Sequence, residues 1–387
     1  MKKILFKVKG LGIGGIERLA IDILNNLKIE NKKIVLLIEN KEEDFLENQL
    51  DKSIEKVYLK PDWFNPFLLK IKLKKKNIFY KLLYNILMNY EKRILSNSIN
   101  NYIKNNKEAE IFIDYNGEAG KYIQKIKVSR KIMWNHLSIA NKKGKKLEKY
   151  GKRLNRYDEI IAICEEMREE LIFEFPYLRE KIKRIYNFID LEKIKEKLSE
   201  NNISEEEKKM MNENYCVSVG RLAEPKDYET TIEAFNLLKK KGIKEKLYIL
   251  GDGIKKEKLQ NMIEEKNLSD QVFLLGIKSN PYIWMENADI FIHSSKLEGF
   301  VMVLLEAMAC NVPIVCSICK TGVKEILNYN VGEGFKIGRT EELTAKIESL
   351  LKDSSKKRIY IKNSKIVVNK FSKEKILKEY KKLIENL

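Results

Sequence analysis

The sequence lacks the long apolar runs and the cysteine pattern of a membrane-spanning or disulfide-stabilised protein. No run among its 387 residues approaches the roughly 18 apolar positions that a transmembrane helix needs. Its five cysteines are scattered and odd in number, which argues against a disulfide framework. Cys316 and Cys319 form a lone C-x-x-C, which we interpret as two small buried residues rather than a zinc or redox site. Lys7 and Lys9 interrupt any signal-peptide core, so a cytoplasmic protein is predicted.

Negative charge is scarce in the first half of the chain. Of the net charge of +19, residues 1–190 contribute +14 (40 basic against 26 acidic) and residues 191–387 contribute +5 (35 against 30). The excess concentrates in residues 67–107, where ten basic residues and one acid, Glu91, are interleaved with aliphatic side chains. This pattern predicts a basic amphipathic segment for an anionic membrane surface, with the solvated face of a core helix as the alternative. No known nucleic-acid module is present, so nucleic acid is not an expected partner.

What the chain does have is a regular alternation of short apolar runs with helical segments, which is typical of parallel α/β layers. Strands are predicted at 3–8, 33–38, 54–59, 110–115, 130–135, 159–163 and 182–186, and then near 214–219, 246–250, 271–275, 288–293 and 313–316. Helices are predicted at 16–28, 78–105 and 165–175, between the later strands and over the last forty residues. The polar segment 191–213 is the predicted linker between two doubly wound domains, 1–190 and 214–371, with a cleft between them.

Two carboxylates lie eight positions apart, across a predicted junction between a strand and a helix. Glu298 follows the buried strand predicted at 288–293, Gly299 breaks the pattern, and Glu306 lies within the next helical run. Open α/β sheets bind ligands at the carboxyl edge of their strands, and a helix N-terminus there favours an anion. The pair therefore suits hydrogen bonding to ligand hydroxyls on either side of a phosphate.

Two cations occupy a similar junction at the start of the second half. Arg221 leaves the end of a predicted strand, and Lys226 comes just before a predicted helix at 228–241. Two cations at such a turn suit a diphosphate, since each charge-assisted hydrogen bond contributes roughly 1.5–3 kcal/mol. Surface ion pairs with Glu224 and Asp227 are the alternative.

A glycine-rich loop follows the first predicted strand, in Lys9-Gly10-Leu11-Gly12-Ile13-Gly14-Gly15. Glycines there allow close approach of a phosphate or sugar and open a helix N-terminus. The loop does not fit G-x-G-x-x-G well, although Glu39 leaves a dinucleotide site open as an alternative.

Several motifs occur together in the order and spacing of a known family. They are Gly220-Arg221-Leu222 with Lys226, Leu250-Gly251-Asp252-Gly253, Glu298-Gly299-Phe300 with Leu304-Leu305-Glu306-Ala307, and Gly14-Gly15-Ile16-Glu17-Arg18. With them the chain resembles glycosyltransferase family 4 (glycosyl transferases group 1), the retaining GT-B enzymes, in its bacterial surface-polysaccharide type. The resemblance covers essentially the whole chain. It implies two Rossmann-like domains facing across a cleft, and a last helix, about 372–387, that crosses back onto the first domain.

The resemblance also implies roles for matching residues. Arg221 and Lys226 would hold the diphosphate of the donor, Glu298 the transferred sugar and Glu306 the ribose hydroxyls. The remaining donor-binding positions would be Gly14, Gly15, Gly251, Gly299, Phe300 and Val301, and His136 would lie near the donor sugar. Val301 departs from the family, which usually has Gly, Pro or Ser there, and is expected to reshape the sugar pocket.

The expected protein is thus a retaining glycosyltransferase that moves a sugar from a nucleotide diphosphate, most simply a UDP-sugar, to a glycan or polyprenyl-linked acceptor for a capsule, lipopolysaccharide or similar polymer. The chain has no Asp-x-Asp motif, so neither a metal nor another cofactor is expected. Three alternatives stay open: a GT-B nucleotide-sugar epimerase, a glycoside hydrolase using Glu298 and Glu306 as acid and base, and a non-catalytic basic adaptor at a membrane or nucleic acid.

Overall fold

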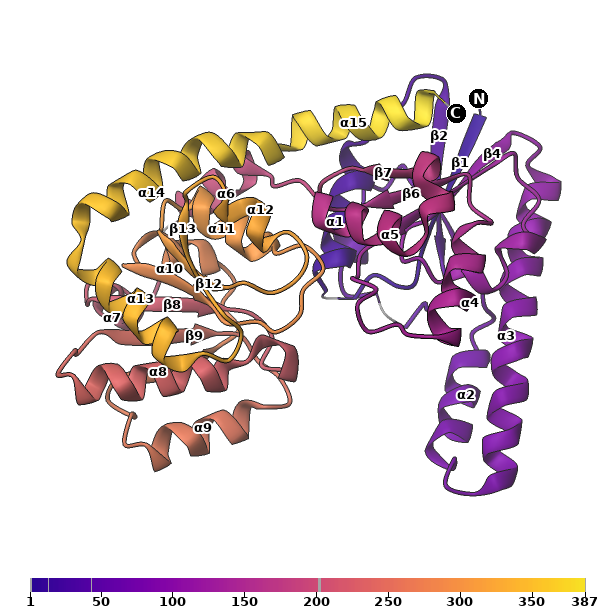
Figure 1. Cartoon of the computed structure of the whole chain (residues 1–387). Helices are drawn as coiled ribbons and strands as arrows, with labels where there is room; N and C mark the ends of the chain where they lie inside the picture. Colours follow the sequence, from indigo (N-terminus) through magenta and orange to yellow (C-terminus); the bar gives the residue numbers. More distant parts are fainter. Residues whose placement is uncertain (1, 13, 43, 201–202, 387) are drawn as a thin grey trace. The chain divides into compact units, whose positions relative to one another are not determined.

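The computed structural model describes residues 2–12, 14–42, 44–200 and 203–386 of the chain (Figure 1). Contacts divide it into two units. The first comprises Met1–Ile163, Met167–Tyr186 and Leu377–Leu387, and the second comprises Cys164–Glu166 and Asn187–Ile376. The two doubly wound domains predicted from the sequence are confirmed as these two units, whereas the cleft between them stays a prediction.

The first unit is built on a parallel sheet in the order β3-β2-β1-β4-β5-β6-β7. Its strands are β1 (Lys2–Val8), β2 (Lys32–Ile38), β3 (Glu55–Tyr58), β4 (Ala109–Asp114), β5 (Arg130–Asn135), β6 (Glu159–Ala162) and β7 (Ile182–Arg184). Its helices are α1 (Gly15–Asn26), α2 (Phe64–Leu73), α3 (Ile78–Asn105), α4 (Lys145–Leu154) and most of α5 (Glu165–Glu174). The central strands are buried and largely apolar, because helices cover both faces of a parallel sheet, although β1 also buries Lys7.

The second unit repeats this design with the order β10-β9-β8-β11-β12-β13. Its strands are β8 (Tyr215–Val219), β9 (Lys246–Leu250), β10 (Val272–Gly276), β11 (Ile290–His293), β12 (Ile314–Ser317) and β13 (Gly332–Phe335). Its helices are α6 (Leu191–Leu198), α7 (Glu205–Met211), α8 (Tyr228–Lys240), α9 (Lys256–Glu265), α10 (Pro281–Glu286), α11 (Met302–Ala309), α12 (Val323–Leu327), α13 (Thr340–Lys352) and α14 (Ser354–Val367). Helix α15 (Lys373–Glu385) begins in this unit and continues in the first.

The segment 191–213 is not the linker that its polar composition suggested. Its described residues form α6 and α7, and they belong to the second unit. Both helices start at capping side chains: Asp190 accepts a hydrogen bond from the Lys193 N–H, and Ser204 forms a capping box with Glu207. Caps and one buried residue per helix, Ile194 and Met211, are enough to make a charged sequence helical here.

The last helix packs into the first unit through an aromatic stack. Tyr380 on α15 lies parallel to the buried Trp134 of β5, with ring centroids 5.0 Å apart. All five cysteines are buried free thiols, in keeping with the interpretation of Cys316 and Cys319 as small core residues. In the described residues no helix is both long enough and apolar enough to cross a bilayer.

A carboxyl pair at the amino edge of the second sheet should make stability depend on pH. Burial, together with the neighbouring Asp289 carboxylate, raises the pKa of Glu245 from 4.5 to about 7. The pKa of Glu245 is thus higher in the folded than in the unfolded protein. The stability that the protonated carboxyl contributes is therefore complete below the unfolded pKa and is lost as pH rises through about 7. We expect Glu245→Gln to have a higher melting temperature than the unmodified protein near pH 8. The advantage should shrink toward pH 5, and parallel melting-temperature profiles of the two proteins would contradict this assignment.

Candidate functional site

The candidate site is built on loops at the carboxyl edge of the second sheet, where β8, β9, β11 and β12 all end. The loops after β8 and β9 are held together by backbone hydrogen bonds from Gly220 N–H to Leu250 O and from Leu222 N–H to Asp252 O, both 2.9 Å. Gly251 has φ +143°, and a Cβ there would lie 2.0 Å from the Gly220 carbonyl oxygen. A glycine at this position is therefore needed to bring the two loops together beneath Arg221, which is exposed.

Lys226, Glu298 and His293 meet at this edge. The Lys226 Nζ donates a hydrogen bond of 2.6 Å to Glu298 Oε1. The Nε2 of His293, the last residue of β11, lies 3.2 Å from the same oxygen. Both contacts fall on Oε1, so they fix the position of the carboxylate.

Electrostatics keep this carboxylate ionised. Burial by itself raises the pKa of Glu298, but the contacts with His293 and Lys226 lower it to about 2. Burial also lowers the pKa of His293, so its ring is neutral near pH 7, and Nε2 lies close to Glu298 Oε1 without a hydrogen bond of normal geometry. Near neutral pH the site thus presents a carboxylate that accepts hydrogen bonds.

The loop carrying Glu298 is fixed from its other side by the loop after β12. The Thr321 hydroxyl donates a hydrogen bond of 2.6 Å to the Glu298 carbonyl oxygen. Thr321 has φ +79°, which is unusual for a β-branched residue and marks a position held by its surroundings. Gly299 therefore lies in a braced loop, and Phe300 and Val301, which follow it, are buried. The side chain of Val301 is thus core, whatever its backbone contributes to a ligand.

Glu306 lies on α11, as its helical sequence context predicted. The Tyr282 hydroxyl of α10 lies 3.5 Å from Glu306 Oε1. The structure thus places Arg221, Lys226, Gly251, Glu298 and Glu306 on one unit, and it joins Lys226 and Glu298 directly.

The remaining predicted residues, Gly14, Gly15 and His136, lie at the carboxyl edge of the first sheet. Gly14 is the N-cap of α1 and Gly15 is its first residue. His136 follows β5, and its buried ring packs edge-on against Tyr115 with centroids 4.5 Å apart. Burial lowers the pKa of His136 to about 4, so its ring is neutral. Neither ring nitrogen has a hydrogen bond of normal geometry within the described part of the chain.

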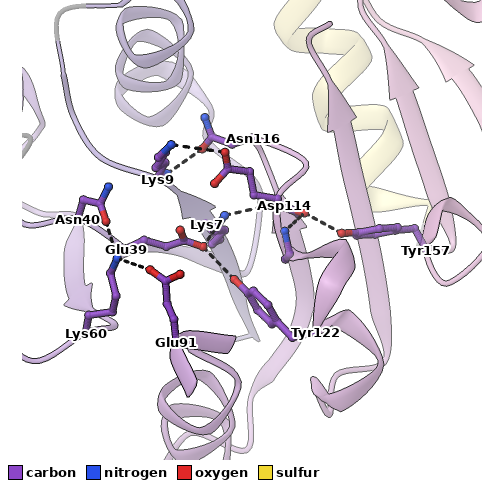
Figure 2. A network of polar contacts seen from close by, with 12 residues as sticks. Lys7, Lys9, Glu39, Asn40, Lys60, Glu91, Asp114, Asn116, Tyr122 and Tyr157 are labelled. Carbon is purple, nitrogen blue, oxygen red and sulfur yellow. Dashed lines mark hydrogen bonds and ion pairs between the residues drawn. The ribbon is translucent and has the colours of Figure 1, made fainter. Parts of the chain in front are cut away.

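A buried charge network occupies the same edge of the first sheet (Figure 2). Lys7 of β1 pairs with Glu39 at 2.8 Å and with Asp114 of β4 at 3.5 Å. The Tyr122 hydroxyl donates to Glu39 at 2.9 Å, and the Tyr157 hydroxyl donates to Asp114 at 2.7 Å. Because Glu39 is committed to Lys7 and Tyr122, it is poorly suited to bind the dinucleotide that was left open as an alternative.

Two contributors to the site were missed in the sequence. His293 falls at the end of the strand predicted at 288–293, and neither it nor Thr321 was predicted from the sequence to have a role in the site. For His293 a signal existed, since it is one of two histidines and comes five residues before Glu298 at the ligand edge of a sheet. Thr321 acts through its hydroxyl on a backbone carbonyl, for which the sequence carries no signal.

Comparisons with known proteins agree with this geometry. The profile of the family described as glycosyl transferases group 1 matches residues 199–367. A Campylobacter jejuni protein named N-acetylgalactosamine-N,N'-diacetylbacillosaminyl-diphospho-undecaprenol 4-alpha-N-acetylgalactosaminyltransferase is 32% identical over 212 residues, 54% of this chain and 55% of the relative. The capsular polysaccharide biosynthesis glycosyltransferase CapM of Staphylococcus aureus is 28% identical over 232 residues, 57% of this chain and 60% of the relative. The chain thus spans about half the length of the curated relatives it matches.

Solved structures match along the whole chain. Anabaena HepE in complex with UDP has a TM-score of 0.76 at 18% identity, covering 100% of both chains. The S. aureus TarM G117R mutant, in complex with fondaparinux, alpha-GlcNAc-glycerol and UDP, has a TM-score of 0.72 at 16% identity, covering 98% of this chain and 99% of TarM. These likenesses establish the fold, which is GT-B with two Rossmann-like units. Together, the comparisons show a GT-B fold for the chain and a match of its residues 199–367 to the glycosyl transferases group 1 family.

Proposed function

We propose that this protein is a retaining, metal-independent glycosyltransferase that moves a sugar from a UDP-sugar to a glycan or lipid-linked acceptor of a bacterial surface polysaccharide. The observation that carries the proposal is the Lys226–Glu298 contact of 2.6 Å, made at the ligand-binding edge of the family-matching unit. A cation beside an ionised carboxylate is the pair that a diphosphate and the hydroxyls of its attached sugar require.

The chemistry follows from where charge develops. When the bond between the sugar and the diphosphate breaks, negative charge grows on the leaving diphosphate. Arg221 and Lys226 are the groups that would stabilise it, and preorganised donors of this kind contribute about 10²–10³ in rate each. Glu298 would accept hydrogen bonds from the sugar, and Glu306 from the ribose. We assign no nucleophile to the protein, because the acceptor would attack on the face from which the diphosphate leaves.

Residues of the first unit also have proposed roles. Gly14 and Gly15, at the N-terminus of α1, would face the donor phosphate and the acceptor. His136 would contact the sugar, for which its buried ring nitrogens are suited. In the second unit, backbone N–H groups of Gly299 and Phe300 would lie beside the transferred sugar.

The names of related proteins support the donor and acceptor classes. HepE was crystallised with UDP and with UDP-glucose, and TarM with UDP. The C. jejuni relative is named for a diphospho-undecaprenol acceptor and an alpha linkage, and an S. aureus poly(ribitol-phosphate) transferase is also named for an alpha product. An alpha product is expected when a retaining enzyme uses an alpha-linked nucleotide sugar. We place the reaction in the cytoplasm, at the inner face of the cell membrane, where such an acceptor would be presented.

The pKa of Glu298 weighs against its acting as the general acid of a glycoside hydrolase. The general acid of a hydrolase needs a raised pKa so that it holds a proton near neutral pH. Glu298 has a pKa lowered to about 2 and is therefore ionised. An epimerase would bind the same donor through the same residues, so an experiment is needed to distinguish it from a transferase.

The test is a panel of UDP-sugars scored for slow release of UDP, in which water replaces the missing acceptor. We expect release from one or a few UDP-sugars, unchanged by a chelator. An epimerase would instead interconvert UDP-sugars without net loss of sugar. Failure of every UDP-sugar to bind by calorimetry would overturn the proposal.

His293 is expected to act as a positioning residue for Glu298. His293→Leu removes the ring nitrogen that lies 3.2 Å from this ionised carboxylate, which should lower kcat/KM for the UDP-sugar about 10- to 100-fold. The Kd of UDP alone should stay the same, because UDP lacks the sugar that Glu298 binds. His293→Gln, which keeps an N–H donor, should recover part of the loss. Equal losses in UDP affinity and kcat/KM would point to general damage rather than positioning.

A further inference from the structure

The first unit carries a helical arm that has no counterpart among the described residues of the second. We define the arm as residues 63–90, which include α2, the turn at 74–77 and the first half of α3. Figure 1 shows α2 and this half of α3 side by side, extending away from the sheet. Asn77 caps α3 by accepting a hydrogen bond from the Phe79 N–H. At the base, Lys60 binds Glu91 at 2.9 Å and Asn40 at 2.6 Å, so the arm is fixed to the sheet edge seen in Figure 2.

The arm gathers exposed apolar side chains. Of the twenty large apolar residues that are exposed in the described chain, nine lie on it: Trp63, Phe67, Leu69, Leu73, Ile78, Phe79, Leu82, Ile86 and Tyr90. Ile78 is 81% exposed and Leu73 is 77% exposed. Ile78, Leu82, Ile86 and Tyr90 recur every four residues, so they form one stripe about 18 Å long on α3. The second half of α3 behaves differently, because Leu95 and Ile99 are buried in the unit.

The charged residues of the same arm are all basic. Residues 63–90 contain six lysines and no aspartate or glutamate. Two lysines of the turn lie over tyrosine rings of α3: Lys74 is 5.3 Å from the Tyr80 ring centroid, and Lys75 is 3.7 Å from that of Tyr84. The lysines thus border the apolar side chains at the end of the arm, as amphipathic side chains do at a lipid surface.

We propose that this arm, rather than the whole basic segment 67–107, is a membrane-docking element that lies in the headgroup layer of an anionic bilayer. The apolar stripe of α3 would enter the upper acyl region, and the lysines would contact anionic headgroups. The proposal rests on the proposed function only for the purpose of the arm, which would be to hold a transferase beside a lipid-linked acceptor. Binding to lipid can be measured without any sugar.

The charge of the arm distinguishes between the partners that could bind it. A symmetric contact with a second copy would bring six lysines against six lysines with no acid on either arm. Nucleic acid would satisfy the lysines, but it would leave the aliphatic stripe in water. An anionic bilayer satisfies both features at once.

The test is co-flotation of the full chain with vesicles of phosphatidylcholine alone or mixed with phosphatidylglycerol. We expect binding to the mixed vesicles only. Lys74→Gln/Lys75→Gln/Lys76→Gln should weaken this binding about 100-fold, since each lysine near an anionic surface contributes a factor of about five. Ile78→Ser/Leu82→Ser should weaken it at least tenfold while leaving the net charge unchanged.

Matched controls lie in the second unit. Lys352→Gln/Lys362→Gln/Lys365→Gln removes the same charge from α13 and α14, and Ile254→Ser removes an exposed apolar side chain; both should bind as the unmodified protein does. A Phe79→Trp reporter should shift its emission to the blue with the mixed vesicles. Absence of binding to them, equal binding by arm and control variants, or an arm-dependent dimer in sedimentation would each overturn the proposal. UDP release measured without vesicles should be unchanged in the arm variants, so the transfer site and the arm can fail independently.

Discussion

Lys226→Ala is expected to lower the rate of UDP release from the preferred UDP-sugar by about 10²–10³ while the protein stays folded. The Lys226 ammonium is the cation fixed against Glu298 at 2.6 Å, and diphosphate charge would develop beside it. Removing it also leaves the Glu298 carboxylate with one fewer donor, so the sugar end of the site should suffer as well. The measurement is single-turnover UDP release, accompanied by a thermal melt.

Glu298→Gln tests the other member of the pair. The amide has no negative charge with which to attract Lys226 and His293, so the sugar-binding group should lose both its fixed position and its accepting strength. We expect UDP release to fall to a similar extent, with UDP itself still binding. Lys239→Ala and Glu348→Gln alter surface ion pairs with Asp270 and Lys241, remote from this edge, and should leave the rate unchanged. Near-normal UDP release by either site variant would contradict the assignment of Lys226 and Glu298 to the active site.

The fold could be predicted from the sequence because buried parallel strands are continuous apolar runs. All the strands predicted for the first unit are present within one or two residues, as is the long helix α3. Strand β13 was missed because Gly332 and Gly334 interrupt its apolar pattern. A Cβ on Gly332 would lie 2.3 Å from Ile314 Cγ1, so glycine is what allows this edge strand to approach β12.

The site was predictable in its residues but not in its contacts. Lys226 and Glu298 were recognised as separate ligands of one donor, whereas the structure pairs them directly, 72 residues apart in the chain. Sequence spacing shows which sheet edge a loop reaches, but not which side chains meet there. His293 was overlooked for this reason, because its position five residues before Glu298 does not show which way its ring points.

The ion pairs of Lys7 are the contacts that were hardest to predict from sequence spacing. In the sequence it interrupts an apolar strand and looks like an ordinary surface lysine. Its partners Glu39 and Asp114 become neighbours only because β2 and β4 flank β1 in the sheet. Although burial alone would lower it, these two carboxylates raise the pKa of Lys7, and the pKa of Glu39 is lowered in return despite its own burial.

Lys7→Met is expected to destabilise the first unit by about 3–5 kcal/mol, because it leaves two buried carboxylates without their cation. Without Lys7, burial should raise the pKa of both Glu39 and Asp114 above their unfolded values. The loss of stability should then be smaller near pH 5 and larger near pH 8, since carboxyls with raised folded pKa stabilise only where they are protonated. Thermal melts of the variant at the two pH values, read for each unfolding transition, measure this difference.

Two further variants separate charge from packing. Lys9→Met removes a half-exposed lysine just beyond the same strand, 3.6 Å from Glu118, and should change stability by no more than about 0.5 kcal/mol. Lys7→Met/Glu39→Gln/Asp114→Asn keeps nearly the same shapes without charge, and it should recover much of the loss, because the cost of the single change comes from unpaired charge. If this triple variant is no more stable than Lys7→Met, the lysine stabilises the sheet through packing of its stem, and the ion pairs in Figure 2 contribute little to folding.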